Sequence, residues 1–575
     1  MEHDPFALFT LFWDDRVFKQ LAINTNLYAN LKPKKWDTLQ PGDQKRTLRS
    51  WKDTTPGELR IFIGLTIKMG LHKEPGRALY WSRQGRNGWT KIWKRSVHTS
   101  GRRRLAKKVH CRLPQNCMSL NRYEQLKQYF HVSDPRVALN IKDWYQKVEP
   151  LASILQQRFQ QYYLPSTKVA IDEMVVRFCS RSQHTLKIRN KPIKQGYKIF
   201  ALCNHGYTYA FLWYSATQGI AQLTESSASL NLTPTSRAVL QLAQHLPPNH
   251  QWHLILDNYF TNVPLFERLR ALGIGAAGTT WVDCTGFPVS LMIEKAEAKK
   301  VLPWGHVSGA VVDNTCCLVW QDNSSVLFMT TYHDITKTVE QLRRRPKKTS
   351  TNATIVRGIF GDQSRKMLPI SEFIDDYNYH MGGVDIADQL RSYYCTQQRS
   401  CHNWYPLFYW LLNTTLVNAY RIQKICHSHR LIRSEHYTFR TRVTEKLIQK
   451  GLKLQNLKTK PPSTTPASPL FTPLPATTSP TQSSKPEASI HNPTPVTTKW
   501  CPCPPTTPPV IPKVIYIPRA NSAQKGSKPC PVAHSPPSTH LLEQRPTRSL
   551  CIFCRWQRSQ HLSPQVKVKS VNLGC

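Results

Sequence analysis

The chain is poor in acidic residues and has no long uninterrupted apolar segment. Its 575 residues contain 35 Asp and Glu against 78 Lys and Arg, a formal net charge of +43 at pH 7. That deficit of acids favours a polyanionic partner, which can be nucleic acid or an anionic membrane surface. The best candidate for a membrane span, residues 400–420, is interrupted by proline, asparagine and threonine. A buried amphipathic helix is the better interpretation, so we expect nucleic acid and no membrane partner.

A signal peptide and a regular cysteine framework are also missing. The first residues, Met1-Glu2-His3-Asp4, are acidic, and no clean apolar stretch follows them. The 16 cysteines are scattered, and without a secretory signal they are better interpreted as reduced or metal-bound thiols than as disulfides. We therefore expect an intracellular protein, and its length predicts several domains.

The first ~165 residues are expected to be mostly helical. Thr55-Pro56-Gly57-Glu58 has the residues of a helix start, with a threonine N-cap, proline in the first turn and glutamate at the third position. Two more helices are predicted from apolar spacing, one through Tyr123 to Phe130 and one through Val148 to Tyr162. Between the helix that starts at Thr55 and the one through Tyr123, residues 83–117 are basic and are interpreted as an exposed insertion, with phosphate contact as the alternative.

From residue 168 the apolar period changes to that of strands. Strands are expected over residues 169–178, 185–188, 197–203 and 209–214, over a run that ends at Asp257, and over residues 274–280. Helices are expected over residues 236–245 and 264–272. This order predicts a mixed α/β sheet with helical cover.

The rest of the chain divides into three parts. Residues 284–369 are expected to be β-rich and contain the basic cluster 343–348, which is typical of a nuclear import signal as much as of a DNA contact. Helices are predicted to resume at Val384 and again over residues 404–426, with the aromatic residues after Trp404 in the core. Beyond residue 455 the composition changes to Pro, Ser and Thr, which predicts a disordered linker.

Three widely separated acidic positions suit metal-dependent phosphoryl transfer. Asp172 and Asp257 each follow an apolar run, and Asp385 and Asp388 are three residues apart on a predicted helix. Carboxylates held where buried strands end can bind two Mg²⁺ ions. Each acid also has a structural explanation: Asp257 in a turn and Asp385 as a helix cap. Glu173 is expected on the opposite face from Asp172 and is not assigned as a ligand.

Four segments strongly resemble piggyBac-type transposases, and the resemblance extends over residues ~5–425. They are residues 169–174 (VAIDEM), 190–198 (NKPIKQGYK), 256–262 (LDNYFTN) and 376–389 (DYNYHMGGVDIADQ).

The resemblance implies an α/β fold with an RNase H-like mixed-sheet catalytic core that is interrupted by a β-rich insertion. Helical segments for dimerisation and DNA binding would flank this core, and a disordered Pro-rich linker would follow it. The expected divisions are residues 1–54 (N-terminal segment), 55–167 (first helical part), 168–283 (first core part), 284–369 (insertion), 370–394 (last core part), 395–454 (second helical part), 455–533 (linker) and 534–575 (partial Cys-rich, zinc-finger-like tail).

The resemblance also assigns the chemistry. It implies catalytic aspartates at Asp172, Asp257 and Asp385, and it places Asp388 as an additional acid near the metal ions. The cofactor would be Mg²⁺, with Mn²⁺ as a substitute. The expected activity is cut-and-paste DNA transposition at TTAA targets in the nucleus, by a homodimer acting on double-stranded DNA.

The C-terminal tail matches the family only in part. His540, Cys551 and Cys554 match the beginning of a cross-braced zinc finger, and Cys575 is the last residue. One tetrahedral Zn²⁺ site can be made from these four, whereas the two sites of the family cannot. A remnant that binds no zinc is the alternative.

Two functions from different classes remain. The first is an active DNA transposase, which the four acids favour. The second is a transposase-derived DNA-binding protein without catalytic activity, favoured by the partial finger and by the lack of the long acidic N-terminal tail common in the family. A third, an RNA-processing nuclease, would need a preference for RNA that the sequence does not indicate.

Overall fold

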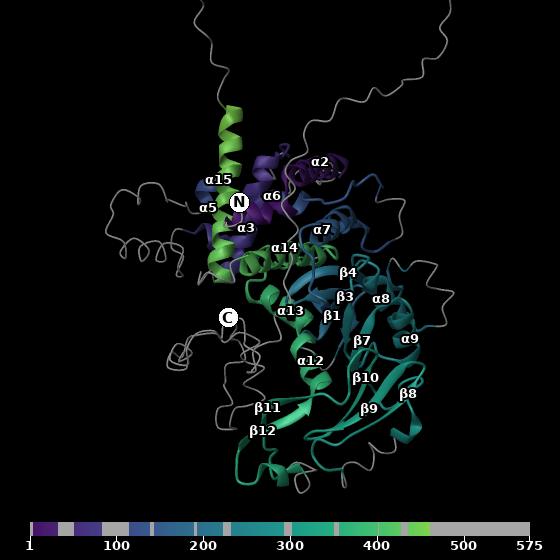
Figure 1. Cartoon of the computed structure of the whole chain (residues 1–575). Helices are drawn as coiled ribbons and strands as arrows, with labels where there is room; N and C mark the ends of the chain where they lie inside the picture. Colours follow the sequence, from purple (N-terminus) through teal and green to yellow (C-terminus); the bar gives the residue numbers. More distant parts are fainter. Residues whose placement is uncertain are drawn as a thin grey trace, which may run out of the picture.

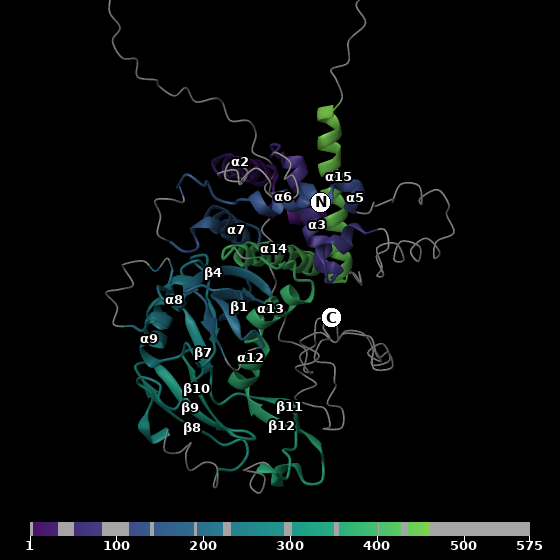
Figure 2. The same ribbon diagram turned by 180° about the vertical axis from the view of Figure 1, so that it is seen from behind.

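The computed structural model describes most of the chain up to residue 459 (Figures 1 and 2). The described residues are 4–32, 51–82, 114–137, 143–188, 192–221, 223, 232–291, 302–349, 356–400, 402–426 and 435–459. Three predictions lie outside this part: the basic insertion over most of residues 83–117, the disordered linker, and the zinc ligands His540, Cys551, Cys554 and Cys575.

A helical layer lies above the sheet in Figure 1. Its helices come from both ends of the described chain, so segments far apart in sequence pack together. They are α1 (Pro5–Phe12), α2 (Asp15–Leu31), α3 (Pro56–Leu71), α5 (Pro114–Cys117), α6 (Leu120–Tyr129), α7 (Glu149–Gln161), α14 (Tyr405–Cys426) and α15 (His436–Thr459), with short 3₁₀ turns at Arg77–Trp81 and Gln146–Val148.

The predicted helix start at Thr55 is confirmed. The Thr55 hydroxyl accepts a hydrogen bond from the Glu58 amide at 3.1 Å, which satisfies an N–H group that has no partner inside the helix. Glu58 in turn accepts from Arg122 of α6 at 2.7 and 2.8 Å. The cap therefore also joins two helices of this layer.

The aromatic residues of α14 lie in the core, as predicted. Phe408 packs on Phe130 with ring centroids 4.8 Å apart, and the Trp13 indole donates to Thr415 at 3.3 Å. Both sides of α14 are buried, because the helical layer covers one side and the sheet covers the other. No helix in the described ranges is long and apolar enough to cross a membrane.

One large mixed sheet forms the other layer. Its strand order is β5-β4-β3-β1-β6-β7-β10-β9-β8, and β2 pairs with β3. The strands are β1 (Lys168–Arg177), β2 (Leu186–Lys187), β3 (Gln195–Asn204), β4 (Tyr207–Ser215), β5 (Gly219–Ile220), β6 (His253–Leu256), β7 (Gly275–Thr279), β8 (Val307–Val312), β9 (Thr315–Gln321) and β10 (Ser325–Thr330).

The middle of this sheet is parallel and its two sides are antiparallel. Strand β1 pairs with β6, and β6 with β7, in parallel, whereas β1, β3 and β4 form an antiparallel meander. The turn between β3 and β4 has positive φ at His205 (47°) and Gly206 (86°), as a tight hairpin requires. The strands and helices predicted over residues 169–280 are all present, with small shifts at their ends.

Helices cover both faces of the sheet. Helices α8 (Pro234–Ala243) and α9 (Val263–Ala271) lie on one side, and α12 (Glu372–His380) and α13 (Gly383–Tyr393) lie on the other (Figure 1). Helix α12 was not predicted from the sequence, where the helix was expected to begin at Val384. The start pattern was visible in the sequence, because Ser371 is the N-cap residue and Glu372 and Asp375 lie in the first turn, although the Ser371 side chain makes no cap hydrogen bond.

The β-rich segment divides into two parts. Strand β10 pairs with β7, so β8, β9 and β10 extend the main sheet. Strands β11 (Thr338–Arg344) and β12 (Arg365–Ser371) form a separate two-stranded ribbon, with a 3₁₀ turn at Gly358–Phe360 between them. The domain boundaries expected from the family resemblance stay predictions.

Candidate active site

Asp172 and Asp257 lie at matching positions on neighbouring parallel strands. Ile171 of β1 pairs with Leu256 of β6, and each aspartate is the next residue. Neighbouring strands are about 4.8 Å apart, and residues in the same register point to the same face. The strand pairing therefore brings together two carboxylates that are 85 residues apart in sequence, at the point where β6 ends beside the middle of β1.

Both carboxylates make the same local hydrogen bond. The Oδ1 atom of Asp172 accepts from the Glu173 amide at 2.7 Å, and Oδ1 of Asp257 accepts from the Asn258 amide at 2.7 Å. These bonds restrict the rotation of each side chain. Asp172 is almost buried, with 8% of its surface exposed, and Asp257 is half-buried.

Asp385 lies in the first turn of α13, which begins against the same face of β1. A Cβ atom on Gly383 would lie 3.3 Å from Cβ of Ala170 and 3.1 Å from the carbonyl oxygen of Cys203. Ala170 is two residues before Asp172 and shares its face. The glycine thus permits the close approach of α13 to β1 and β3, and Asp385 is two residues further along the helix.

The charges of these acids act on a common neighbour. Burial raises the pKa of the Cys203 thiol to about 12, and the negative charges of Asp172, Asp388 and Asp385 add to this effect. Cys203 is the cross-strand partner of Ala170. The aspartates of β1 and α13 therefore share one electrostatic environment.

The pKa of Tyr377 in α12 is affected by the charges of Asp257 and Asp172. Burial raises its pKa, and the charges of Asp257 and Asp172 raise it further. Its hydroxyl is 3.1 Å from Oγ1 of Thr279, which follows Gly278, the β7 partner of Leu256. Tyr377 thus lies beside Asp172 and Asp257, although sequence analysis gave it no role.

Asp388 has a cationic partner. Arg391 donates to Oδ1 of Asp388 from both Nε, at 3.1 Å, and Nη2. The same guanidinium donates to the carbonyl oxygen of Val175 in β1 at 3.3 Å. The pair fixes α13 to β1. The i,i+3 spacing of opposite charges on a helix was a visible sign of this contact in the sequence.

Asp376 is the centre of a buried polar cluster next to the site. It accepts from Lys168, from Tyr332 at 3.1 Å and from His333 at 3.0 Å, and His380 is 3.6 Å away. Burial alone would raise the pKa of Asp376, but the His333 hydrogen bond and the charges of His380 and Lys168 together lower it. The cluster joins α12 to β1 and to the end of β10. It thereby holds Tyr377 in place.

Oxygen donors of this kind are those that Mg²⁺ prefers. Within the described residues, however, no group of three or more His, Cys, Asp or Glu side chains lies close enough together to hold a metal ion. The strand register brings Asp172 and Asp257 together, and α13 brings Asp385 to the same face of the sheet. The structure does not bring all three carboxylates into one cluster.

Two residues near Asp172 face away from it. Glu173 lies on the opposite face of β1, as expected, and its carboxylate is 3.9 Å from Nζ of Lys198. Lys198 is only 7% exposed, and its Nζ is 4.0 Å from the centre of the Tyr259 ring. Lys198 is therefore a buried side chain and not part of a solvated face of the sheet.

Sequence comparison places most of the chain in one family. The family model described as Transposase IS4 matches residues 4–96 and 104–420. Human piggyBac transposable element-derived protein 3 is 26% identical over 429 residues, which cover 73% of this chain and 61% of the relative. Human piggyBac transposable element-derived protein 2 is 24% identical over 433 residues, covering 74% and 62%. The chain thus spans about three fifths of the length of these relatives.

A solved structure has a similar fold. The cryo-EM structure of the piggyBac transposase synaptic complex with hairpin DNA aligns with a TM-score of 0.56 and 18% identity. The alignment covers 81% of this chain and 87% of that one. At this identity the likeness concerns the fold alone, and it extends over both the sheet and the helical layer.

Proposed function

Because the chain belongs to the piggyBac-type transposase family, we propose that it is a DNA transposase that cleaves and joins DNA strands at TTAA sites by two-metal phosphoryl transfer. The observation that carries this proposal is the matching register of Asp172 and Asp257 on β1 and β6. Two carboxylates fixed side by side on neighbouring inner strands are the beginning of a metal-binding site for phosphoryl transfer.

We infer that the sheet contains an RNase H-like core. The strands β4, β3, β1, β6 and β7 support this, because an antiparallel meander is followed by two parallel strands that helices connect. In that arrangement an acid in the middle of β1 and an acid directly after β6 are neighbours, and a later helix completes the site. Helix α13 occupies that position here.

The residues that would hold the cations are Asp172, Asp257 and Asp385. Bound Mg²⁺, or Mn²⁺ in its place, would neutralise charge on the attacking and leaving oxygens of the scissile phosphate. The main-chain N–H groups of Glu173 and Asn258 orient the first two carboxylates. Asp388, predicted as a further metal ligand, stays a candidate, and its ion pair with Arg391 gives it a second role in fixing α13.

The substrate in this proposal is double-stranded DNA, both the transposon ends and the TTAA target. The net charge of +43 supports a polyanionic substrate. A homodimer and a nuclear location are further parts of the proposal, and they rest on the resemblance and on the DNA substrate. Zinc at His540, Cys551, Cys554 and Cys575 stays a prediction from the sequence.

A DNA-binding protein without catalytic activity is the second candidate. Two observations favour it: the described acids do not form a three-ligand group, and Asp388 is paired with a buried arginine. The human relatives are also named as transposable element-derived proteins. Both candidates require DNA binding, so cleavage is what separates them.

The deciding experiment uses the purified full chain and duplexes that carry the ends of the element encoding it. We expect nicked and hairpin products with Mg²⁺ and none with EDTA. Asp257→Asn should reduce cleavage by at least about 100-fold while DNA affinity stays within about twofold, because Asn keeps the Oδ1 acceptor for the Asn258 amide.

Glu267→Gln is the matched control, because Glu267 is an exposed acid on α9 outside the site. It should cleave like the wild type. DNA binding by the wild type without any Mg²⁺-dependent product would favour the second candidate. Full cleavage by Asp257→Asn would contradict the assignment of the catalytic aspartates.

A further inference from the structure

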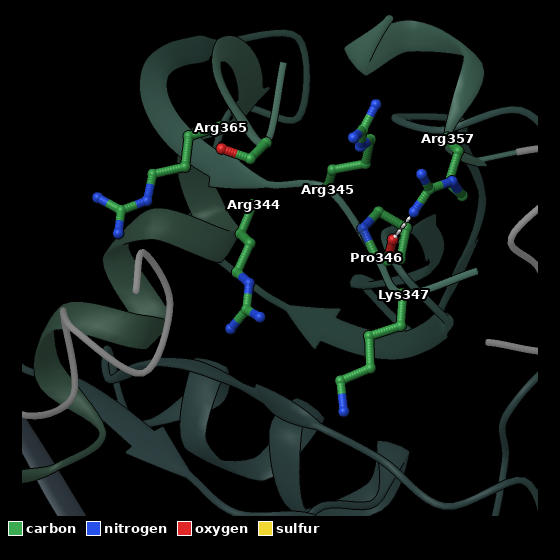
Figure 3. A pocket seen from close by; sticks show the side chains of 7 residues that line it. Arg344, Arg345, Pro346, Lys347, Arg357 and Arg365 are labelled. Atoms are coloured by element: carbon green, nitrogen blue, oxygen red, sulfur yellow. Dashed lines mark hydrogen bonds between the residues drawn. The ribbon is translucent and has the colours of Figure 1, made fainter. Parts of the chain in front are cut away.

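A basic pocket opens at the end of the β11–β12 ribbon (Figure 3). It has a volume of about 480 Å³ and is lined by seven residues, of which five are Arg or Lys and none is acidic. The five cations are Arg344, Arg345, Lys347, Arg357 and Arg365. In Figure 1 the ribbon lies at the far end of the molecule from α15.

The strand register sets like charges against each other in this ribbon. Arg344 of β11 is directly opposite Arg365 of β12, and Arg343 is opposite Lys366. Like charges at opposite positions of an antiparallel pair are destabilising. Arg343 is compensated by an ion pair with Asp322. For Arg344 and Arg365, the described part of the chain provides no hydrogen bond or ion pair to the side chain.

Two other arginines hold the walls of the basic pocket. Arg357 donates to the carbonyl oxygen of Pro346, the dashed line in Figure 3, and Arg345 donates to the carbonyl oxygen of Gly361. The Arg345 amide also donates to the carbonyl oxygen of Ser364 at 3.0 Å. These bonds use neutral acceptors, so they fix the guanidinium groups without cancelling their charge. Asp362 is exposed in the same turn but does not line the pocket.

A phosphate group is the ligand that matches these features. A guanidinium presents N–H donors in a planar fork that fits two phosphate oxygens, and it keeps its charge at any physiological pH. The lining contains no aromatic residue, so the pocket offers no surface on which a nucleotide base can stack. Backbone phosphates of a duplex therefore fit better than a free nucleotide.

We propose that the basic pocket of the β11–β12 ribbon binds backbone phosphates of double-stranded DNA, at a site separate from Asp172 and Asp257. This inference rests on the proposed function for the identity of the polyanion. Strand β12 leads directly into α12, which carries Tyr377. Its seven residues rise on the order of 20 Å, so the phosphates contacted here lie outside the one that is cleaved.

The test measures duplex affinity against salt concentration, with the Asp257→Asn chain so that no substrate is consumed. Adding Arg344→Gln and Arg365→Gln should weaken binding about tenfold near 0.15 M salt. It should also reduce the slope of log K against log salt by about 1.8, because each phosphate contact contributes about 0.9. Arg344→Lys with Arg365→Lys keeps the charges and should keep most of the slope.

The matched control removes two exposed charges elsewhere, by Lys337→Gln and Arg268→Gln, and should leave the slope nearly unchanged. The Arg344→Gln, Arg365→Gln chain should be at least as stable to denaturant as its parent, because the opposed charges are gone. An unchanged slope would overturn the proposal. The proposal would also be overturned, in favour of a small phosphate ligand, by a second result. In that result the wild type binds ATP or tripolyphosphate, the pocket variants do not, and all of them bind duplex DNA with the same affinity.

These outcomes are independent of the proposed function. If the wild type binds duplex DNA but never cleaves it, the proposed catalysis is contradicted. The salt slope still tests the role of the basic pocket. Conversely, normal cleavage by the wild type together with an unchanged salt slope in the pocket variants contradicts only the proposed phosphate site.

Discussion

The buried guanidinium of Arg391 binds the carboxylate of Asp388 on one side and the main chain of β1 at Val175 on the other. Asp388 was predicted from the family resemblance as an acid near the metal ions. Its partner shows that the same carboxylate also has a structural task, because the ion pair fixes the helix that carries Asp385. The two tasks predict different results on substitution.

We expect Asp388→Asn to lower the free energy of unfolding by about 1–3 kcal/mol. Arg391 would lose its charged partner inside the protein, and the cost is reduced because the Asp388 side chain is one third exposed. Denaturant unfolding measures this effect. If Asp388 acts only through α13, the Mg²⁺ concentration for half-maximal cleavage should stay within about twofold of the wild type.

Asp385→Asn is the comparison for that experiment, and it should abolish cleavage without a comparable loss of stability. A large increase in the Mg²⁺ requirement of Asp388→Asn, with normal stability, would show instead that Asp388 is a metal ligand. Both variants keep an Oδ1 acceptor, so they differ from the wild type mainly in charge.

Asp376 should make stability depend on pH in the acid range. Its pKa in the folded protein is lower than the ordinary value of 3.8, so its contribution is complete above that value. The contribution is lost as the pH falls through the lower folded value. At neutral pH, Asp376→Asn should cost about 3–5 kcal/mol, because it leaves Lys168 without its buried partner.

Denaturation at several pH values checks this prediction. The difference between the wild type and Asp376→Asn should become smaller as the pH falls below about 4. A difference that stays constant down to pH 2 would contradict the assignment of the charged form. Cleavage at neutral pH should fall as well, because α12 and Tyr377 depend on this cluster.

Gly451 should be essential for the packing of α15 on α3. A Cβ atom at this position would lie 2.5 Å from the Gly57 carbonyl oxygen and 2.6 Å from Cγ1 of Ile61. Gly451→Val should therefore destabilise the protein by about 1–3 kcal/mol. Faster amide hydrogen exchange throughout α15 would locate the effect. Gly358→Ala is the control, because a Cβ atom there meets nothing within 4 Å, and it should be nearly neutral.

Local patterns were sufficient for most single elements. The start of α3 at Thr55 and the strands β1 and β6 depend on nearby residues, so they were predicted correctly. Helix α12 was missed although Ser371, Glu372 and Asp375 give it a local start pattern. Tyr377 and Asp376 stood in a segment that the family resemblance identified, but nothing in their spacing indicated a partner.

The charge of the chain, the period of its strands and helices, and the positions of Asp172 and Asp257 after apolar runs could all be read from the sequence. Three relationships came from the fold alone. Strands β1 and β6 are parallel neighbours in matching register, and Arg391 forms an ion pair with Asp388. Arg344 lies opposite Arg365 in the β11–β12 ribbon. The physical reason is that strand pairing and helix docking depend on contacts between residues tens or hundreds of positions apart. A local pattern records which face a residue takes, but not which distant strand or helix lies against that face.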